Sequence, residues 1–228
     1  AKGSNEEAYL VQKLVRAGFG TNNVDHCTRL CHASSVAALL ENIGSGAVTA
    51  SFSECRNAEA IIVIGANPTV NHPVAATFIK NAAQRGARLY VLDPRGQNLD
   101  RYATHSLNFT PGSDVALLNA MINVIISEEL FDAAYVRDHT EGFSELKERT
   151  LNTTPESMSP ICGIAPEVIR DVARGYASAE GAMIFWGMGI SQHTHGTDNS
   201  RCLISLALLT GNVGKAGSGL HPLRGQNN

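Results

Sequence analysis

The sequence lacks the features of membrane proteins and of nucleic-acid-binding proteins. Its longest apolar runs, at 60–64 and 203–209, are far shorter than the roughly 20 residues needed to cross a bilayer. Acidic residues outnumber basic ones and the net charge is −3, so no basic surface is expected. We therefore expect a soluble globular protein with no membrane span and no nucleic-acid partner.

The sequence also lacks the cysteine pattern of a secreted protein. Its five cysteines are odd in number and scattered, at Cys27, Cys31, Cys55, Cys162 and Cys202. They form no recognisable disulfide framework, and no signal peptide or twin-arginine stretch is visible, so a reducing, cytoplasmic location is expected. The abrupt start without an initiator Met indicates a segment of a longer protein.

Two common nucleotide-binding motifs are missing as well. No G-x-G-x-x-G follows the first expected strand, which disfavours a plain nicotinamide-binding domain. No G-x-x-x-x-G-K-[ST] occurs, which disfavours a P-loop NTPase.

The hydrophobic pattern that is present indicates an α/β fold. Aliphatic runs at 60–64, 88–92 and 182–186 predict buried parallel strands, and a short strand is expected at 107–109. Helices are expected over 34–41, 73–84, 115–127 and 197–209, with two or three more between 133 and 176, and the glycine-rich stretch 211–219 is expected to be a loop. We predict two nucleotide-fold-like lobes with parallel sheets flanked by helices, one within 1–130 and one within 131–228.

Each expected strand ends in a loop suited to a ligand. The loops are Gly65-Ala66-Asn67-Pro68, Asp93-Pro94-Arg95 and Gly187-Met188-Gly189. Ligands of open parallel sheets bind outside the carboxyl ends of the strands, so this architecture favours nucleotide binding. Taken singly, the first loop is equally well explained as a simple strand-to-helix turn, and the second as a surface turn with an ion pair.

The dipeptide Cys31-His32 is the main candidate for chemistry. A thiolate is a soft ligand for a transition metal, and an imidazole can exchange a proton near neutral pH. A Cys-His pair by itself is structural more often than functional. His193 and His195 form an H-x-H pattern, but they follow a glycine loop and are better explained as solvated loop residues.

Six motifs in order carry a resemblance to a known family. They are Arg29-Leu30-Cys31-His32, Gly65-Ala66-Asn67-Pro68 with His72-Pro73, Asp93-Pro94-Arg95, Trp186-Gly187-Met188-Gly189, Thr210-Gly211-Asn212-Val213-Gly214 and Arg224-Gly225-Gln226-Asn227-Asn228. They resemble the molybdopterin oxidoreductase superfamily and, within it, the central part of the formate dehydrogenase large subunit. The phrases Asn23-Val24-Asp25-His26-Cys27 and Ile190-Ser191-Gln192-His193 are most similar to the cytoplasmic NAD-dependent type.

The resemblance implies a cofactor and a set of site residues. A molybdenum or tungsten ion would be held by two molybdopterin guanine dinucleotides and by Cys31, with His32 and Arg224 as the other catalytic residues. Arg224 would anchor the carboxylate of formate, for which a guanidinium is a suitable bidentate partner. The implied cofactor contacts are Asn67, His72, Asp93, Arg95, Gly112 and Asp114 for the first dinucleotide, Gly187, Met188, Gly189, Gln192 and Gly211 for the second, and Gln226 near the pterin.

The sequence departs from the family in two respects. It contains no four-cysteine motif for the family's N-terminal [4Fe–4S] cluster and no C-terminal domain that closes over the cofactors. We therefore expect the segment alone to be inactive. The parent enzyme would oxidise formate to carbon dioxide and pass electrons through iron–sulfur and flavin subunits to NAD.

Two alternatives stay open at this point. One is a non-catalytic scaffold relative, like the large subunit of respiratory complex I, which has lost the metal cofactor. The other is an unrelated nucleotide-binding domain, in which Cys31 and Arg224 would lie far apart. The enzyme hypothesis predicts instead that these two residues converge on one pocket.

Overall fold

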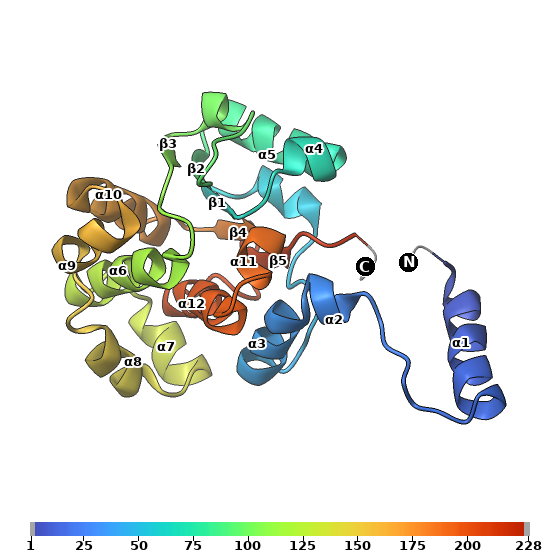
Figure 1. Cartoon of the computed structure of the whole chain (residues 1–228). Coiled ribbons are helices and arrows are strands. Elements are labelled where there is room, and N and C mark those ends of the chain that lie inside the picture. The colour runs from blue at the N-terminus through green and yellow to red at the C-terminus, as the bar shows by residue number, and fades with distance from the viewer. Residues whose placement is uncertain (1–2, 226–228) are drawn as a thin grey trace.

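Five parallel strands form one sheet within residues 3–225, the part of the chain that the computed structural model describes (Figure 1). The strand order is β3-β2-β1-β4-β5. The strands are β1 (Ala60–Ile64), β2 (Arg88–Leu92), β3 (His105–Leu107), β4 (Ala182–Trp186) and β5 (Gly219–Pro222). The expected α/β class with a parallel sheet flanked by helices is thus confirmed.

Helices connect the strands and cover both faces of the sheet. They are α1 (Asn5–Lys13), α2 (Thr28–Cys31), α3 (Ala33–Ile43), α4 (Pro68–Asn71), α5 (Pro73–Gln84), α6 (Asp114–Ser127), α7 (Ala133–His139), α8 (Phe143–Thr150), α9 (Pro155–Cys162), α10 (Pro166–Ala177), α11 (Met188–Ser191) and α12 (Gly196–Leu209). A π-helical segment, η1 (Leu14–Gly18), and two short 3₁₀ helices, η2 (Phe52–Arg56) and η3 (Asp100–Tyr102), complete the helical elements of the described residues.

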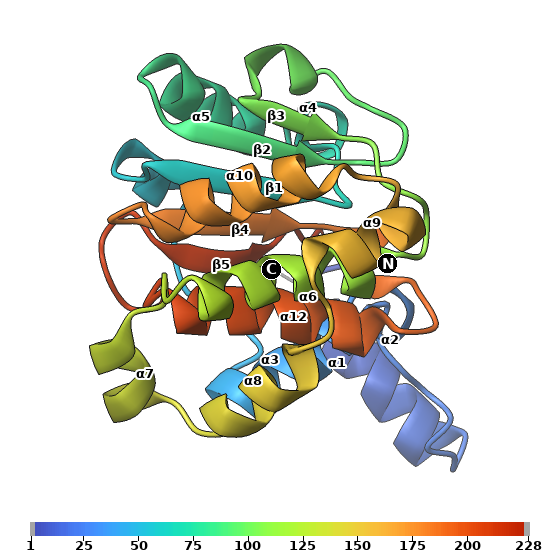
Figure 2. The ribbon, with the colours of Figure 1, turned by 90° about the vertical axis from the view of Figure 1, so that its left-hand side faces the viewer.

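Alternation along the strands divides the core into two layers. Side chains of successive strand residues point to opposite faces, so Ile62 packs in one cluster with α6, α10 and α12, while Ile61 and Val63 pack in the other with α5. Figure 2 shows the strands side by side, with α10 crossing in front of them. All five residues of β1 and of β4 are buried, which explains why these strands are continuously apolar in the sequence.

The two lobes expected from the sequence share a single sheet. β1 pairs in parallel with β2 on one side and with β4 on the other, so Ile62 faces both Tyr90 and Ile184. Separate sheets would leave one edge of β1 unpaired in the core, where free backbone groups are costly. The strand order therefore changes direction between β1 and β4, and such a switch point creates a crevice at the carboxyl ends.

The last strand differs from its sequence-based expectation. The stretch 211–219 was expected to be a loop leading to His221, and it is one as far as Ser218. Gly219–Pro222 then forms β5, a strand that was not expected, which pairs with β4 from Met183↔Gly219 to Trp186↔Pro222. Gly and Pro are unfavourable in strands, so only the pairing with β4 reveals it. The short strand expected at 107–109 lies two residues earlier, at His105–Leu107. The stretch 133–177 contains four helices, where two or three were expected.

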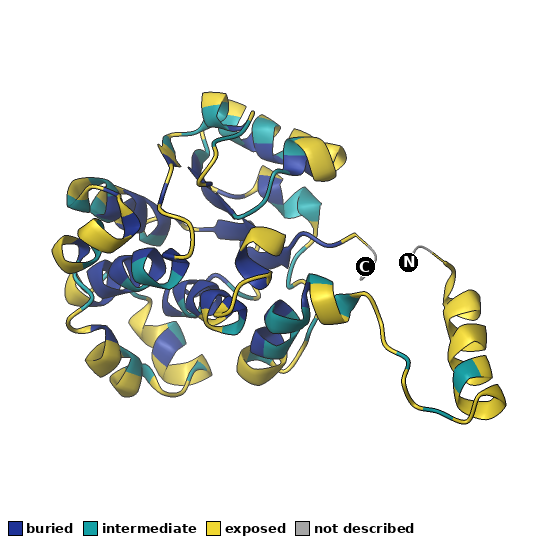
Figure 3. Ribbon diagram, in the orientation of Figure 1, coloured by how far each residue is buried: buried dark blue, intermediate teal, exposed yellow. Residues whose placement is uncertain are grey.

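Helix α1 stands apart from the sheet. It has no buried residue and projects away from the rest of the molecule (Figure 3). A capping box closes its first turn, because the Ser4 hydroxyl accepts from the Glu7 amide and the Glu7 carboxylate accepts from the Ser4 amide. No helix within residues 3–225 is long and apolar enough to span a membrane.

A contact between two glycines joins the loops after β1 and β4. The amide of Gly189 donates to the carbonyl of Gly65 at 2.9 Å. A Cβ atom on Gly189 would lie 2.6 Å from that carbonyl oxygen and 2.7 Å from the Gly65 Cα. Backbone atoms cannot rotate away as a side chain does, so glycine is required on both sides of this contact.

We expect Gly189→Ala to lower the free energy of unfolding by about 2–3 kcal/mol, because the new methyl group overpacks a backbone contact. Urea denaturation would measure the change. Gly18→Ala is the matched control, since its Cβ would meet only the flexible Leu14 side chain, at 3.1 Å, and a change within about 0.5 kcal/mol is expected. Equal stability of the two variants would contradict the steric argument.

His221 is a buried histidine in β5. Its ring stacks on Phe52 with centroids 4.2 Å apart and on Phe185 with centroids 5.0 Å apart. Burial is the main cause that lowers the pKa of His221 to about 4, and the positive charge of Arg224 adds to the effect. The imidazole is therefore neutral in the folded protein at neutral pH.

This burial predicts a loss of stability in mild acid. Below the unfolded-state pKa of about 6.5, His221 is protonated in the unfolded chain but stays neutral in the folded chain. The free energy of unfolding is therefore highest above pH 6.5 and decreases as the pH falls towards 4. Urea denaturation at pH 7.5 and pH 5 should show about 2 kcal/mol less loss for His221→Phe than for the wild type. Equal losses in both proteins would show that His221 does not cause the acid sensitivity.

Candidate active site

A cavity of about 840 Å³ opens at the carboxyl edge of the sheet. Loops after all five strands contribute to its wall, which is the position expected for a ligand at a switch point. Its size is in the upper part of the range of roughly 300–1,000 Å³ that is usual for cofactor pockets. The lining residues after each strand in turn include Gly65 to Asn67, Asp93 to Arg95, Phe109 to Asp114, Gly187 to Gly189, and Leu223 with Gly225.

Cys31 and His32 enter this cavity from the turn between α2 and α3. Cys31 ends the single turn of α2, and His32 adopts a non-helical conformation with φ −137° before α3 begins. The Cys31 thiol is free and partly exposed. Burial is the first cause that raises the pKa of this thiol, the neighbouring Cys27 raises it further, and the positive charge of Arg224 lowers it.

His32 is almost fully buried, with 1% of its surface exposed. Burial lowers the pKa of His32 to about 4, and the charges of Arg224 and His72 act in the same direction. A cation beside a desolvated imidazole disfavours a second positive charge. His32 is therefore held as a neutral imidazole beside the thiol.

Arg224 lies in the same place, although it is far from Cys31 in the sequence. Its side chain is buried, and its Nη2 donates to the carbonyl of Gly46 at 2.5 Å. The imidazole Nε2 of His72 donates to the Arg224 carbonyl at 2.8 Å. Because the charge of Arg224 acts on both Cys31 and His32, the three groups converge on one site. Leu223 and Gly225, on either side of Arg224 in the chain, line the cavity together with Cys31 and His32, as the enzyme hypothesis expects. The roles of the three residues stay predictions.

Most of the cofactor contacts implied by the sequence line the cavity. They are Asn67, His72, Asp93, Arg95, Gly112, Asp114, Gly187, Met188 and Gly189. Gln192 is not among the lining residues. It is exposed, and its Nε2 donates to the Leu30 carbonyl at 2.7 Å. The role of these residues in binding stays a prediction.

Gly211 is a second implied contact that does not line the cavity, because it follows the far end of α12, whose 14 residues span about 21 Å. It packs instead against Asp132 and Tyr135 at the start of α7. Gln226 lies outside the described residues.

Two buried acidic groups give the cavity a polar wall. The Asp93 carboxylate accepts from the Arg95 amide at 2.8 Å, which closes the turn after β2. Asp114 starts α6, and its burial raises the pKa of its carboxyl, while the charge of His193 opposes the shift. Arg95 and the glycine loops line the same cavity, so its wall includes both donors and acceptors for a large polar ligand.

The structure adds lining residues that the sequence reasoning had not assigned to the site. Cys27, Asn71 and Phe109 line the cavity, and so does His193, which is exposed as expected for a loop histidine. Cys27 could have been found from its spacing, because residues four apart share a helix face with Cys31. His193 could have been assigned to the cavity from the sequence, because it closely follows the glycine loop at the carboxyl end of β4.

Within residues 3–225, no group of three or more His, Cys, Asp or Glu side chains is arranged to hold a metal ion.

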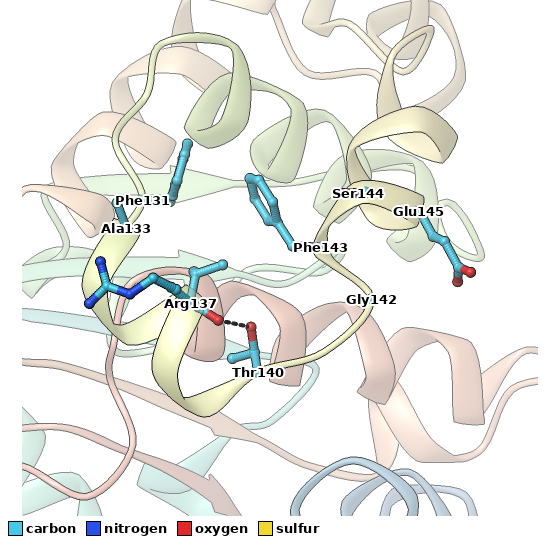
Figure 4. A pocket seen from close by; sticks show the side chains of 9 residues that line it. Phe131, Ala133, Arg137, Thr140, Gly142, Phe143, Ser144 and Glu145 are labelled. Atoms are coloured by element: carbon cyan, nitrogen blue, oxygen red, sulfur yellow. Dashed lines mark hydrogen bonds between the residues drawn. The ribbon is translucent and has the colours of Figure 1, made fainter.

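A second cavity, of about 500 Å³, lies between α7 and α8 (Figure 4). Phe131 and Phe143 lie in it with ring centroids 4.8 Å apart. Arg137, the basic residue at its rim, is paired with Asp138 at 2.7 Å. This cavity contains no thiol or imidazole, so it lacks the chemistry of the first.

Comparison with known proteins gives the chain a family. The molybdopterin oxidoreductase family model matches residues 2–227. The chain is 45% identical to the F420-dependent formate dehydrogenase subunit alpha of Methanocaldococcus jannaschii, over 100% of this chain and 34% of that protein. It is 46% identical to formate dehydrogenase H of Escherichia coli, over 98% of this chain and 31% of that protein.

A solved structure supports the same relationship. Acetylene hydratase from Pelobacter acetylenicus superposes with a TM-score of 0.73 at 29% identity, over 82% of this chain and 25% of that chain. The chain spans about a third of the length of the curated relatives it matches. With the sheet, the carboxyl-edge cavity and the family model in agreement, the chain belongs to the molybdopterin oxidoreductase family.

Proposed function

We propose that this chain is the cofactor-holding central part of a formate dehydrogenase alpha subunit, which oxidises formate to carbon dioxide. The observation that carries the proposal is the convergence of the Cys31 thiol, the neutral His32 imidazole and the buried Arg224 guanidinium at one end of the sheet. Four relatives named formate dehydrogenases, at 40–46% identity, support it.

The residues of the cavity fit the cofactor of the family. Cys31 offers a soft sulfur ligand suited to molybdenum or tungsten. Gly65, Gly187 and Gly189 line the wall without side chains, so a phosphate can approach the backbone closely, and Arg95 can pair with it. When bound, a molybdopterin guanine dinucleotide centre supplies the two-electron redox chemistry that formate oxidation needs.

The protein groups then have distinct tasks. Arg224 binds the formate carboxylate, because a guanidinium offers two parallel donors at a position where water is largely excluded. Cys31 would be the protein ligand of the metal. His32 lies beside both, and the position of its single ring proton decides whether it donates a hydrogen bond to formate or accepts a proton from it.

The experiment uses the intact parent enzyme. Wild-type protein should contain molybdenum or tungsten with guanine nucleotide, and it should oxidise formate. Cys31→Ser should abolish turnover, because an alcohol is a hard, poorly ionised ligand. Absence of the metal together with absence of formate turnover in the wild type would overturn the proposal and favour a scaffold relative.

Arg224→Lys keeps the charge but removes the planar fork, so we expect the KM for formate to rise by about tenfold to a hundredfold while metal and guanine content stay unchanged. Arg137→Lys is the matched control, since Arg137 lies at the other cavity (Figure 4) and should leave the kinetics unchanged. An unchanged KM in Arg224→Lys would remove Arg224 from formate binding.

We further propose that the parent enzyme passes its electrons through iron–sulfur and flavin subunits to NAD in the cytoplasm. The support is the likeness of the phrases at 23–27 and 190–193 to the NAD-dependent type. The relative from Methanocaldococcus jannaschii is named F420-dependent, so the acceptor is a point of difference to be measured. Formate-driven reduction of NAD by the parent complex is expected, and reduction of F420 without NAD would contradict the proposal.

A further inference from the structure

Helix α2 needs contacts from outside itself to keep its shape. It is a single turn, Thr28–Cys31, with no side-chain cap at its start and no buried residue among its four. Isolated helices of fewer than about 12 residues are only marginally stable in water. Because this turn carries Cys31 at the wall of the cavity, whatever holds the turn also fixes the position of the thiol.

The end of helix α11 holds the turn on the side before Cys31. Gln192 directly follows α11, and its Nε2 donates to the carbonyl of Leu30 at 2.7 Å. The last four carbonyls of a helix have no partner within that helix, so this bond satisfies one of the open carbonyls of α2. Leu30 directly precedes Cys31, and the contact therefore lies next to the thiol in the chain.

Ser191 holds the chain on the side after Cys31. The Ser34 hydroxyl donates to the Ser191 carbonyl at 2.7 Å, and the Ser35 and Ser191 hydroxyls are 2.6 Å apart. Ser35 and Ser191 are buried, so little water competes for these hydrogen bonds. Two neighbouring residues, Ser191 and Gln192, thus hold the chain on both sides of Cys31. We call these two residues the α11 clamp.

The α11 clamp is itself tied to the rest of the fold. The Gly189 amide donates to the Gly65 carbonyl at 2.9 Å, which joins α11 to the loop after β1. The Nδ2 of Asn199, a buried residue of α12, donates to the Ile190 carbonyl at 3.1 Å. Helix α11 therefore connects the sheet and α12 on one side with the turn that carries Cys31 on the other.

The first residue of α12 leaves room for the clamp. A Cβ atom on Gly196 would overlap the Ser191 carbonyl oxygen and would lie 2.9 Å from the Ser34 hydroxyl oxygen. Only glycine leaves the bond between Ser34 and Ser191 undisturbed at this position. Three helices, α3, α11 and α12, thus approach one another closely at this single hydrogen bond.

We propose that Ser191 and Gln192 are positioning residues, which hold the turn that carries Cys31 so that its thiol stays at the cavity. The family resemblance implied a cofactor contact for Gln192, whereas this proposal assigns its side chain to the protein itself. The meaning for catalysis rests on the proposed function, in which Cys31 would be the metal ligand. The clamp acts on the folded chain, and its effect on the turn does not depend on the substrate.

Hydrogen exchange of the intact parent enzyme tests the clamp. The amides of Cys31 and His32 donate to the carbonyls of Cys27 and Thr28, both at 3.1 Å, so they exchange when the turn opens. Mass spectrometry of peptides that cover residues 28–36 measures this opening. No substrate is present, so the result is independent of formate turnover.

Gln192→Ala and Ser34→Ala each remove one hydrogen bond of the clamp, the first to Leu30 and the second to the Ser191 carbonyl. Each variant should speed the exchange of residues 28–36 by about tenfold, because the lost bond no longer favours the closed turn. Ser34→Thr keeps the hydroxyl and should retain the wild-type rate. Unchanged exchange in both alanine variants would overturn the proposal.

Gln84→Ala and Ser218→Ala are the matched controls. Gln84 is an exposed glutamine at the end of α5, and Ser218 is a buried serine whose hydroxyl donates to the Lys215 carbonyl at 2.7 Å. Gln84 ends the helix that leads into β2 and Ser218 directly precedes β5, so both lie towards the edge of the sheet opposite the cavity. Their exchange at 28–36 should equal that of the wild type. Equal acceleration in the controls and in the clamp variants would indicate a general loss of stability and would overturn the role of the clamp.

Formate kinetics of the parent enzyme give a second readout. A displaced Cys31 would misplace the reacting centre, so kcat should fall by about tenfold or more in Gln192→Ala and Ser34→Ala. KM should stay within about twofold, because Arg224 is held separately by its bond to the Gly46 carbonyl. Unchanged kcat in variants whose turn opens faster would overturn the positioning role. Absence of formate turnover in the wild type would overturn the proposed function alone, since the exchange result does not depend on it.

Discussion

The backbone contact between Gly65 and Gly189 is the constraint on which the site depends. It joins the loops after β1 and β4 at the point where the strand order reverses, with the Gly189 amide donating to the Gly65 carbonyl at 2.9 Å. Any side chain would push the loops apart. Their separation would also move α11, and with it Ser191, away from the turn that carries Cys31 and His32.

Desolvation beside a single buried cation determines the protonation of the site. Arg224 is the charge that acts on Cys31, His32 and His221, and it favours the thiolate while opposing a protonated imidazole. Burial keeps both histidines neutral beside this positive charge, which suits the proposed binding of the formate anion. The same burial predicts that the folded protein loses stability in acid.

Much of the fold could be predicted because its central strands are buried on both faces. Such strands are continuously apolar, so 60–64, 88–92 and 182–186 were visible from the sequence, and the residues that follow them line the cavity. The fifth strand could not be predicted, because Gly219 and Pro222 are poor strand formers and become strand residues only by pairing with β4. The position of Gly211 was also not visible, since it depends on the direction in which α12 leaves the cavity.

The sequence by itself determined the α/β class, the strand-end loops that line the cavity and the chemical types of Cys31, His32 and Arg224, because local apolar runs and motifs are properties of neighbouring residues. Only the tertiary structure decided that β1 and β4 share a sheet, that the charge of Arg224 acts on Cys31, and that Ser191 meets the ring of His32. These features arise between residues far apart in the chain. Strand pairing, desolvation and hydrogen bonding depend on which groups meet in space, and a local sequence pattern does not show which distant groups meet.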